Sequence, residues 1–208
     1  NFLHEPNYNA VLYLKETIWP LIKKQLPKAE LHIYGAYATK KINQLHNEKE
    51  GFLIKGFAED VNEVMQQAKV CLAPIQFGAG LKGKLVDAMQ NGTPCVTTSV
   101  GAEGMFGNFE TNGFIEDKPE DFVNKAIELY QDENLWEEKQ QNAITFYKMA
   151  YEGKPREAVD LYVGNAYIQH NPDVADAKKG FIDYFEKMQN EYPNKSIEFV
   201  RSIAEGDF

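Results

Sequence analysis

The sequence predicts an α/β fold in which helices cover both faces of a parallel sheet. Two observations predict this class: strand-like segments alternate with helix-like segments, and the strand-like segments are short and apolar. A glycine-rich loop directly follows one of these apolar runs. Strands of parallel sheets are buried on both faces, so they read as continuous apolar runs. In such sheets ligands bind beyond the carboxyl ends of the strands. The glycine-rich loop is therefore the first candidate for a site.

The elements expected in the first part of the chain follow one another in regular alternation. Strands are expected over residues 30–35, 51–56, 70–75, 94–98 and 112–117. Helices are expected over residues 9–26, 38–47, 58–68, 81–92 and 119–131. In the first helix, Pro20 predicts a kink or a break into two short helices, because proline lacks the N–H that a helix interior needs. The apolar stripe of that helix is Val11, Leu12, Leu14, Ile18, Leu21 and Ile22.

The composition of the 208-residue chain is that of a globular protein, with 43% hydrophobic and 25% charged residues. Acidic residues number 31 and basic residues 22, a net charge of −9, so we expect no nucleic-acid partner. No apolar run approaches the ~18 residues of a membrane span, and no signal peptide is visible. Cys71 and Cys95 lie in apolar runs, which favours buried, reduced thiols. We therefore expect a cytoplasmic protein without a transmembrane segment.

The sequence pattern changes around residues 133–150. These residues predict a helix that could belong to either part of the chain. Beyond it we expect a helix over residues 154–163, an extended run over 167–172, a helix over 177–193 and a strand over 196–208. The 177–193 helix carries one apolar stripe, formed by Phe181, Tyr184, Phe185 and Met188. A strand without partners offers an unpaired edge to another chain, so a homo-oligomer formed through this incomplete sheet is a further expectation.

The glycine-rich loop and the helix after it have the residues of an anion site. Gly78 and Gly80 would let the backbone approach a ligand closely. The first turn of a helix presents free N–H groups that attract phosphate. Lys82 and Lys84 are expected in that turn, where positive charge opposes the helix dipole unless an anion lies nearby. Asp87, one turn beyond Lys84, could accept hydrogen bonds from a ribose diol. From spacing alone, a glycine turn with a solvated Lys/Asp pair explains the loop equally well, and it is not a Walker loop.

The ordered runs on both sides of this loop resemble a known family. Residues 1 to about 138 look like the C-terminal, donor-binding domain of a GT-B glycosyltransferase of group 1 (family 4), with a Rossmann-like sheet. The runs that carry the resemblance are "NFLHEPNYNAVLYLKETIWPLI", "PKAELHIYG", "GFAEDVNEVMQQAKVCLAPI" and "GAGLKGKLVDAMQNGTPCVTTSVGAEGM". The resemblance implies retaining transfer of a sugar from a nucleotide-diphosphate sugar to an acceptor hydroxyl. The nucleotide-sugar is then a substrate, and neither another cofactor nor a metal is implied.

The resemblance also implies which residues bind the donor and which parts of the family's structure are missing. The donor-binding residues that it implies are Gly56, Phe57, Gly78, Gly80, Lys82, Lys84 and Asp87. The two lysines would hold the diphosphate, Asp87 the ribose, and Gly56–Phe57 would lie beside the base, with the 100–105 loop closing the other side. Family members often carry a Glu at the position of Ala79, so no catalytic residue is assigned and the donor sugar stays open. The N-terminal acceptor domain and most of the first strand are missing, so this fragment is expected to be inactive alone.

The last part of the chain resembles a second family. Residues 139–208 look like the start of SnoaL-like proteins, relatives of polyketide cyclases, through "YIQHNP" and "ADAKKGFIDYF". The resemblance implies an incomplete α+β segment after a donor domain over residues 1–138. His170 could face a pocket as a polar contact or acid/base, but a histidine bonded to nearby backbone to fix the turn is the favoured explanation. The alternative function is thus a small-molecule-binding or cyclase/isomerase-type module, with the α/β part as its scaffold.

Overall fold

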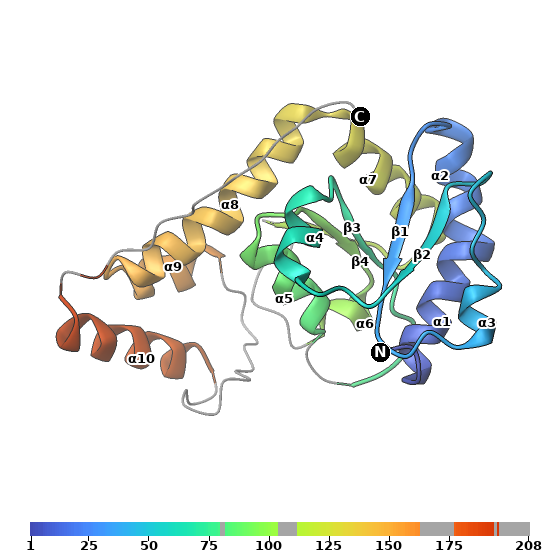
Figure 1. The fold of residues 1–208 in the computed structure, drawn as a ribbon. Helices are drawn as coiled ribbons and strands as arrows, with labels where there is room; N and C mark the ends of the chain where they lie inside the picture. The colour runs from blue at the N-terminus through green and yellow to red at the C-terminus, as the bar shows by residue number, and fades with distance from the viewer. Residues whose placement is uncertain (80–81, 104–111, 163–176, 194, 196–208) are drawn as a thin grey trace.

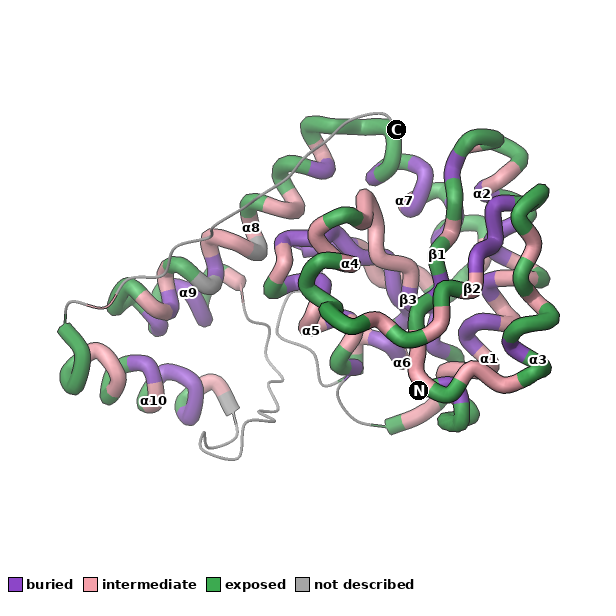
Figure 2. The backbone as a smooth tube through the Cα atoms, in the orientation of Figure 1, coloured by how far each residue is buried: buried purple, intermediate pink, exposed green. Residues whose placement is uncertain are grey.

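The computed structural model describes residues 1–79, 82–103, 112–162, 177–193 and 195 (Figure 1). An α/β unit occupies the first part of the chain, and long helices extend away from it (Figure 1). Figure 2 shows buried positions in both parts, around the strands and along the last helices. No helix among the described residues is long and apolar enough to cross a membrane.

The first helical segment is continuous but changes its winding. It consists of α1 (Glu5–Tyr13), the π-helical turn η1 (Leu14–Ile18) and α2 (Trp19–Gln25). Pro20 lies in the first turn of α2, so the interruption predicted at this proline takes the form of a wide turn just before it. The expected apolar stripe fails at Leu21, which is 40% exposed. The extra residue of a π turn rotates the following helix, and this rotation carries Leu21 away from the core.

The strands are parallel, as expected, but they form two hydrogen-bonded sheets rather than one. β1 (Leu31–Tyr34) pairs with β2 (Phe52–Gly56), while β3 (Cys71–Ala73), β4 (Cys95–Thr97) and β5 (Gly113–Ile115) form the second sheet in that order. All three pairings are parallel. Within the described residues, β1 and β3 each have a second edge without a partner strand.

Helices cover both faces of this layer. The elements between and after the strands are α3 (Lys40–Asn43), α4 (Val61–Gln67), α5 (Gly83–Gln90), α6 (Ser99–Ala102) and α7 (Pro119–Gln131). α7 contacts α2, η1 and β4, while α5 contacts α4, β3 and β4. The middle strand β4 therefore has α7 and α5 packed against it, and Val96 on this strand is fully buried. α7 begins as its sequence predicts, with Pro119 and two acidic residues in its first turn.

Three helices follow the α/β unit: α8 (Glu133–Tyr151), α9 (Pro155–Tyr162) and α10 (Ala177–Glu191). The stripe predicted on α10 is confirmed, because Phe181 and Phe185 are buried and pack with Phe146 of α8 in a cluster of their own. The boundary expected between residues 138 and 139 lies within α8. The extended run with His170 and the strand-like run 196–208 lie outside the described residues.

Trp136 fastens α8 to the α/β unit. The indole is 2% exposed, its Nε1 donates a hydrogen bond to the Lys69 carbonyl oxygen, and the Lys69 ammonium lies 4.5 Å from the ring centroid. Trp136→Phe should lower the free energy of unfolding by about 1–2 kcal/mol, because a carbonyl in a partly buried place loses its donor. Urea unfolding measures this change, with the exposed neighbour Glu137→Gln as the control. Equal stability of both variants would show that this contact does not fasten α8.

Candidate functional site

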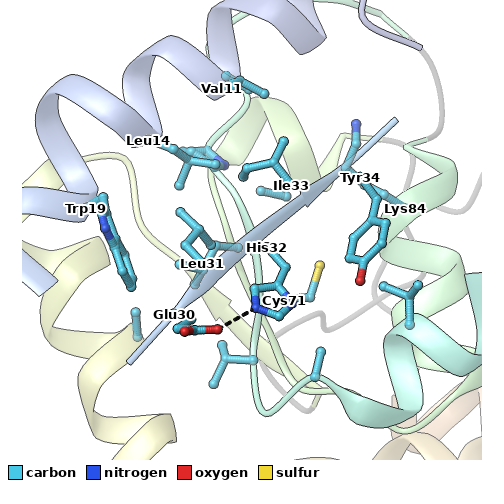
Figure 3. A pocket seen from close by; sticks show the side chains of 18 of the residues that line it. Val11, Leu14, Trp19, Glu30, Leu31, His32, Ile33, Tyr34, Cys71 and Lys84 are labelled. Atoms are coloured by element: carbon cyan, nitrogen blue, oxygen red, sulfur yellow. Dashed lines mark hydrogen bonds and ion pairs between the residues drawn. The ribbon is translucent and has the colours of Figure 1, made fainter. Parts of the chain in front are cut away.

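A cavity of about 700 Å³ lies between β1 and β3. Its walls are mostly apolar, and Figure 3 shows β1 crossing it with Cys71 and Lys84 nearby. One group of polar residues in the wall consists of Asn1, Asn7, Lys84 and Asp87. Lys28, Lys69 and the hydrogen-bonded pair Glu30–His32 also contribute to the wall. Lys84 and Asp87 come from α5, so the structure brings these two predicted residues to one cavity.

Lys84 lies in the first turn of α5, and its ammonium is directed toward the N-terminal segment. Its Nζ donates a hydrogen bond to Asn7 Oδ1 at 3.1 Å. Burial lowers the pKa of Lys84; the neighbouring Cys71 thiol opposes this effect, and the Lys82 charge adds to it. Among the described residues no carboxylate forms an ion pair with Lys84. A desolvated cation without a countercharge favours an anionic ligand, because the ligand would supply the missing charge.

Lys82 is placed differently from the prediction. α5 begins at Gly83 rather than near residue 81, so Lys82 is the N-cap residue, with extended backbone, and does not lie in the first turn. Its side chain is 8% exposed, and its Nζ donates to the Gly78 carbonyl oxygen at 3.1 Å. This bond joins the two described residues on either side of residues 79–81. Lys82 thus links the start of α5 to Gly78.

Gly78 is required by both conformation and space. Its φ is +114°, in the region that favours glycine, and a Cβ there would lie 2.9 Å from the Pro6 ring. The loop can therefore approach α1 only with glycine at this position. The tight packing of Gly78 against Pro6 places the loop beside the segment that carries Asn7, the partner of Lys84.

Asp87 is half-buried and follows Lys84 on the same helix. Burial raises its pKa above the ordinary value of an aspartate. No hydrogen bond or ion pair to its carboxylate is present among the described residues. An ionised carboxylate accepts hydrogen bonds only, so Asp87 is suited to a ligand that donates them, such as a hydroxyl pair.

The other predicted residues that the structure describes, Gly56, Phe57, Gly78 and Lys82, do not line this cavity. Gly56 ends β2 with φ +78°, and Phe57 is 71% exposed; both lie at the carboxyl end of β2, outside the cavity wall. Gly80 lies outside the described residues, as does the end of the 100–105 loop. The start of that loop forms α6, whose first turn is capped by Thr98 through its bond from the Gly101 N–H.

Sequence reasoning missed two residues that contribute to the site. Asn7 is the partner of Lys84, and Tyr34 at the end of β1 lines the same cavity. Neither has a local signal, because both reach the site from elements distant in the sequence. The two cysteines are register partners on β3 and β4, and both thiols are free, with Cys95 buried and Cys71 half-buried at the cavity wall. Among the described residues no group of His, Cys, Asp and Glu could hold a metal ion.

The fold and the site together define a parallel α/β domain with a cationic end to its cavity. A family model described as "Glycosyl transferases group 1" matches residues 1–132, and the chain belongs to this family. No curated protein matches the chain. The family match ends at residue 132, so it does not reach the segment expected to be SnoaL-like.

Two solved structures share the fold. One is a mutant of S. aureus TarM in complex with Fondaparinux, alpha-GlcNAc-glycerol and UDP, with a TM-score of 0.59 and 17% identity over 90% of this chain and 34% of that one. The other is the pneumococcal O-GlcNAc transferase GtfA in complex with UDP and GlcNAc, with a TM-score of 0.56 and 16% identity over 93% of this chain and 35% of that one. The likeness supports the Rossmann-like fold of a GT-B half. The chain spans about a third of the length of these proteins.

Proposed function

We propose that residues 1–138 bind a nucleotide-diphosphate sugar and act as the donor domain of a retaining glycosyltransferase that passes the sugar to an acceptor hydroxyl. The observation that carries this proposal is Lys84, a desolvated ammonium that forms no ion pair with a carboxylate of the described residues and lines the cavity together with Asp87. Membership of the group 1 glycosyltransferases supports it. Two solved proteins with this fold were determined with UDP bound, which supports a nucleotide-diphosphate ligand.

The roles of the residues follow from their positions on α5. The diphosphate would lie at the start of α5, where Lys84 supplies charge and the first N–H groups of the helix point outward. Charge placed there stabilises the departing diphosphate when the bond to the sugar breaks. Asp87 would accept hydrogen bonds from the ribose, and the Lys82–Gly78 bond would keep the loop in shape. Gly56, Phe57 and Gly80 remain proposed contacts of the base and the loop.

The proposal needs a second domain to bind the acceptor. Because the chain spans about a third of its solved structural neighbours, we propose that it binds the donor without turning it over alone. The nucleotide-sugar is the substrate, and no metal is required by the proposed charge arrangement. From the sequence alone, we also propose a cytoplasmic location and self-association through residues 196–208.

Calorimetric titration tests the donor site. We expect UDP, GDP or one of their sugars to bind, and the corresponding nucleoside to bind at least about tenfold more weakly, because it lacks the phosphates that Lys84 contacts. The nucleoside and the diphosphate differ only in the group that the site is proposed to recognise, so the comparison is internally controlled. If none of the diphosphates or nucleotide-sugars binds, the proposal fails.

The affinity for the nucleotide diphosphate should fall at acidic pH with a contribution from Asp87. The folded-state pKa of Asp87 is raised by burial, so its carboxylate takes up a proton at a pH above the ordinary aspartate value and then loses acceptor capacity. Asp87→Asn should bind more weakly at neutral pH and should lose this part of the pH dependence. Titrations of the parent chain and of Asp87→Asn from pH 4 to 8 separate protonation of Asp87 from protonation of the ligand, because protonation of the ligand affects both proteins alike. Parallel pH profiles would contradict the role of Asp87.

For residues 139–208 the SnoaL-like module remains a second proposal. The observation in its favour is the separate apolar cluster of α8, α9 and α10, which includes Phe146 and Phe181. A cluster of this kind is what an independent module needs, although it also serves simple helix packing. Binding of a hydrophobic small molecule near His170, in a chain extended beyond Phe208, would support the module.

A further inference from the structure

The two cysteines of the chain lie side by side on neighbouring strands. Cys71 begins β3, Cys95 begins β4, and the two residues are partners in the parallel register of these strands. Residues paired in this way have their side chains on the same face of the sheet. Neighbouring strands are about 4.8 Å apart, and cysteines whose Cα atoms are about 4.4–6.8 Å apart can form a disulfide. The register therefore brings the two thiols within reach of a disulfide bond.

The helix α5 packs over both thiols. Cys95 belongs to an apolar cluster that includes Leu85 and Met89 of α5, and Cys71 packs against the same cluster. Leu85 and Met89 are both buried, and a side-chain hydrogen bond joins the two thiols. Side chains in a close-packed layer have few alternative positions. The two sulfur atoms are therefore held next to each other.

The surroundings of the two thiols make them unequal in reactivity. Cys71 is half-buried, whereas Cys95 is fully buried. The hydrogen bond from Cys95 lowers the pKa of the Cys71 thiol; burial opposes this effect, and the Lys84 ammonium adds to it. The same hydrogen bond and burial raise the pKa of Cys95. Because the thiolate is the nucleophilic form of cysteine, Cys71 is the thiol suited to attack first, and Cys95 is the thiol that would resolve the product.

We propose that Cys71 and Cys95 form a thiol-oxidation site, at which a small organic disulfide converts the two thiols into one intramolecular disulfide. The Cys71 thiolate attacks one sulfur of the small disulfide, so that a mixed disulfide forms and one small thiolate leaves. The Cys95 thiol then gives up its proton and attacks the Cys71 sulfur, and the second small thiolate leaves. The two cysteine protons end on the two released thiols. Two cysteine thiols are thus oxidised while one small disulfide is reduced.

The disulfide would close a loop that contains the candidate donor site. Residues 72–94, between the two cysteines, include Lys84 and Asp87. A cross-link restricts the segment between its ends when that segment unfolds. The oxidation state of the pair would therefore act on the segment that carries these two residues. This consequence rests on the proposed donor function, whereas the chemistry of the two thiols does not.

Intact-mass measurement of the folded chain after incubation with 2-hydroxyethyl disulfide tests the proposal. We expect the parent chain to lose the mass of two hydrogen atoms, to remain a monomer on a non-reducing gel, and to recover both thiols in dithiothreitol. Cys95→Ser should instead keep one mixed-disulfide adduct on Cys71, because no second thiol resolves it. Cys71→Ser should react at least about tenfold more slowly than Cys95→Ser, since its remaining thiol is buried and has a raised pKa.

Each measurement can overturn the proposal. Two stable adducts on the parent chain, a disulfide-linked dimer, or an unchanged mass under conditions that fully oxidise dithiothreitol would show that the pair forms no internal disulfide. Equal reaction rates of Cys71→Ser and Cys95→Ser would overturn the assignment of Cys71 as the attacking thiol. None of these measurements uses a nucleotide, so their failure is distinct from a failure of UDP to bind.

Discussion

Replacing Lys84 by methionine is expected to weaken nucleotide-diphosphate binding by at least about thirtyfold, the lower end of the effect of removing one partner from a desolvated charge pair. Methionine keeps most of the apolar stem, so the change removes the charge and the bond to Asn7 Oδ1. Calorimetry with UDP or the best-binding diphosphate measures the loss. The matched control is Lys24→Met, an exposed lysine of α2.

The same variant should keep about the stability of the parent chain, because relief of the buried charge offsets the loss of the donor to Asn7 Oδ1. Burial lowers the pKa of Lys84, so the folded state disfavours the charged form that predominates at neutral pH in the unfolded chain. Removing the charge removes this unfavourable contribution, which in the parent chain declines as the pH rises above the folded-state pKa and is gone only above the pKa of the unfolded chain. Weaker binding together with unchanged or higher Tm would thus identify a ligand contact. Unchanged binding, or loss of binding together with the fold, would contradict the assignment.

Gly101→Ala should lower the free energy of unfolding by about 2–3 kcal/mol, an overpacking penalty in a filled interior. A Cβ at this position would lie 2.0 Å from Thr97 Oγ1, and Gly101 and Thr97 are both buried. Thr97 is held there because its hydroxyl donates to the Ala73 carbonyl at 2.7 Å. For a chain of this size the expected fall in Tm is about 5–10 °C. Thermal and urea unfolding measure the two quantities.

Gly83→Ala is the matched control for this prediction. A Cβ at Gly83 meets nothing within 4 Å, and the residue begins α5, so alanine there should leave the stability unchanged or raise it. In the double variant Thr97→Ala/Gly101→Ala, the second change should cost much less than it does alone, because the clashing hydroxyl is gone. If Gly101→Ala behaves like Gly83→Ala, α6 does not pack against β4 as the structure describes.

The strands and their direction could be predicted because buried parallel strands have a simple sequence pattern. The run 94–98 is apolar or β-branched throughout, and it forms the fully buried strand β4. Its partners could not be predicted, since an apolar run indicates a strand without indicating its neighbour. The separation of β1 from β3 therefore appears only in the structure.

The candidate site was predicted in its residue types better than in its geometry. It could be predicted that Lys84 and Asp87 line the same cavity, because residues three apart lie on one face of a helix and this spacing is visible in the local sequence. The Lys84–Asn7 bond joins residues 77 positions apart, and no local pattern reports such a contact. Lys82 was misplaced because the helix starts two residues later than expected, and helix ends are the least certain feature of a sequence prediction. Leu21 was misplaced because nothing in the apolar periodicity signals a π turn.

The most direct test of the donor site is to locate the nucleotide on the chain by amide-resolved NMR during a UDP titration. The structure predicts that the largest shifts occur at Gly83, Lys84 and Asp87 of α5 and at the side-chain amide of Asn7, with the amides of α9 and α10 unchanged. Shifts confined to α9 and α10, or saturating UDP without any shift at α5, would contradict the account.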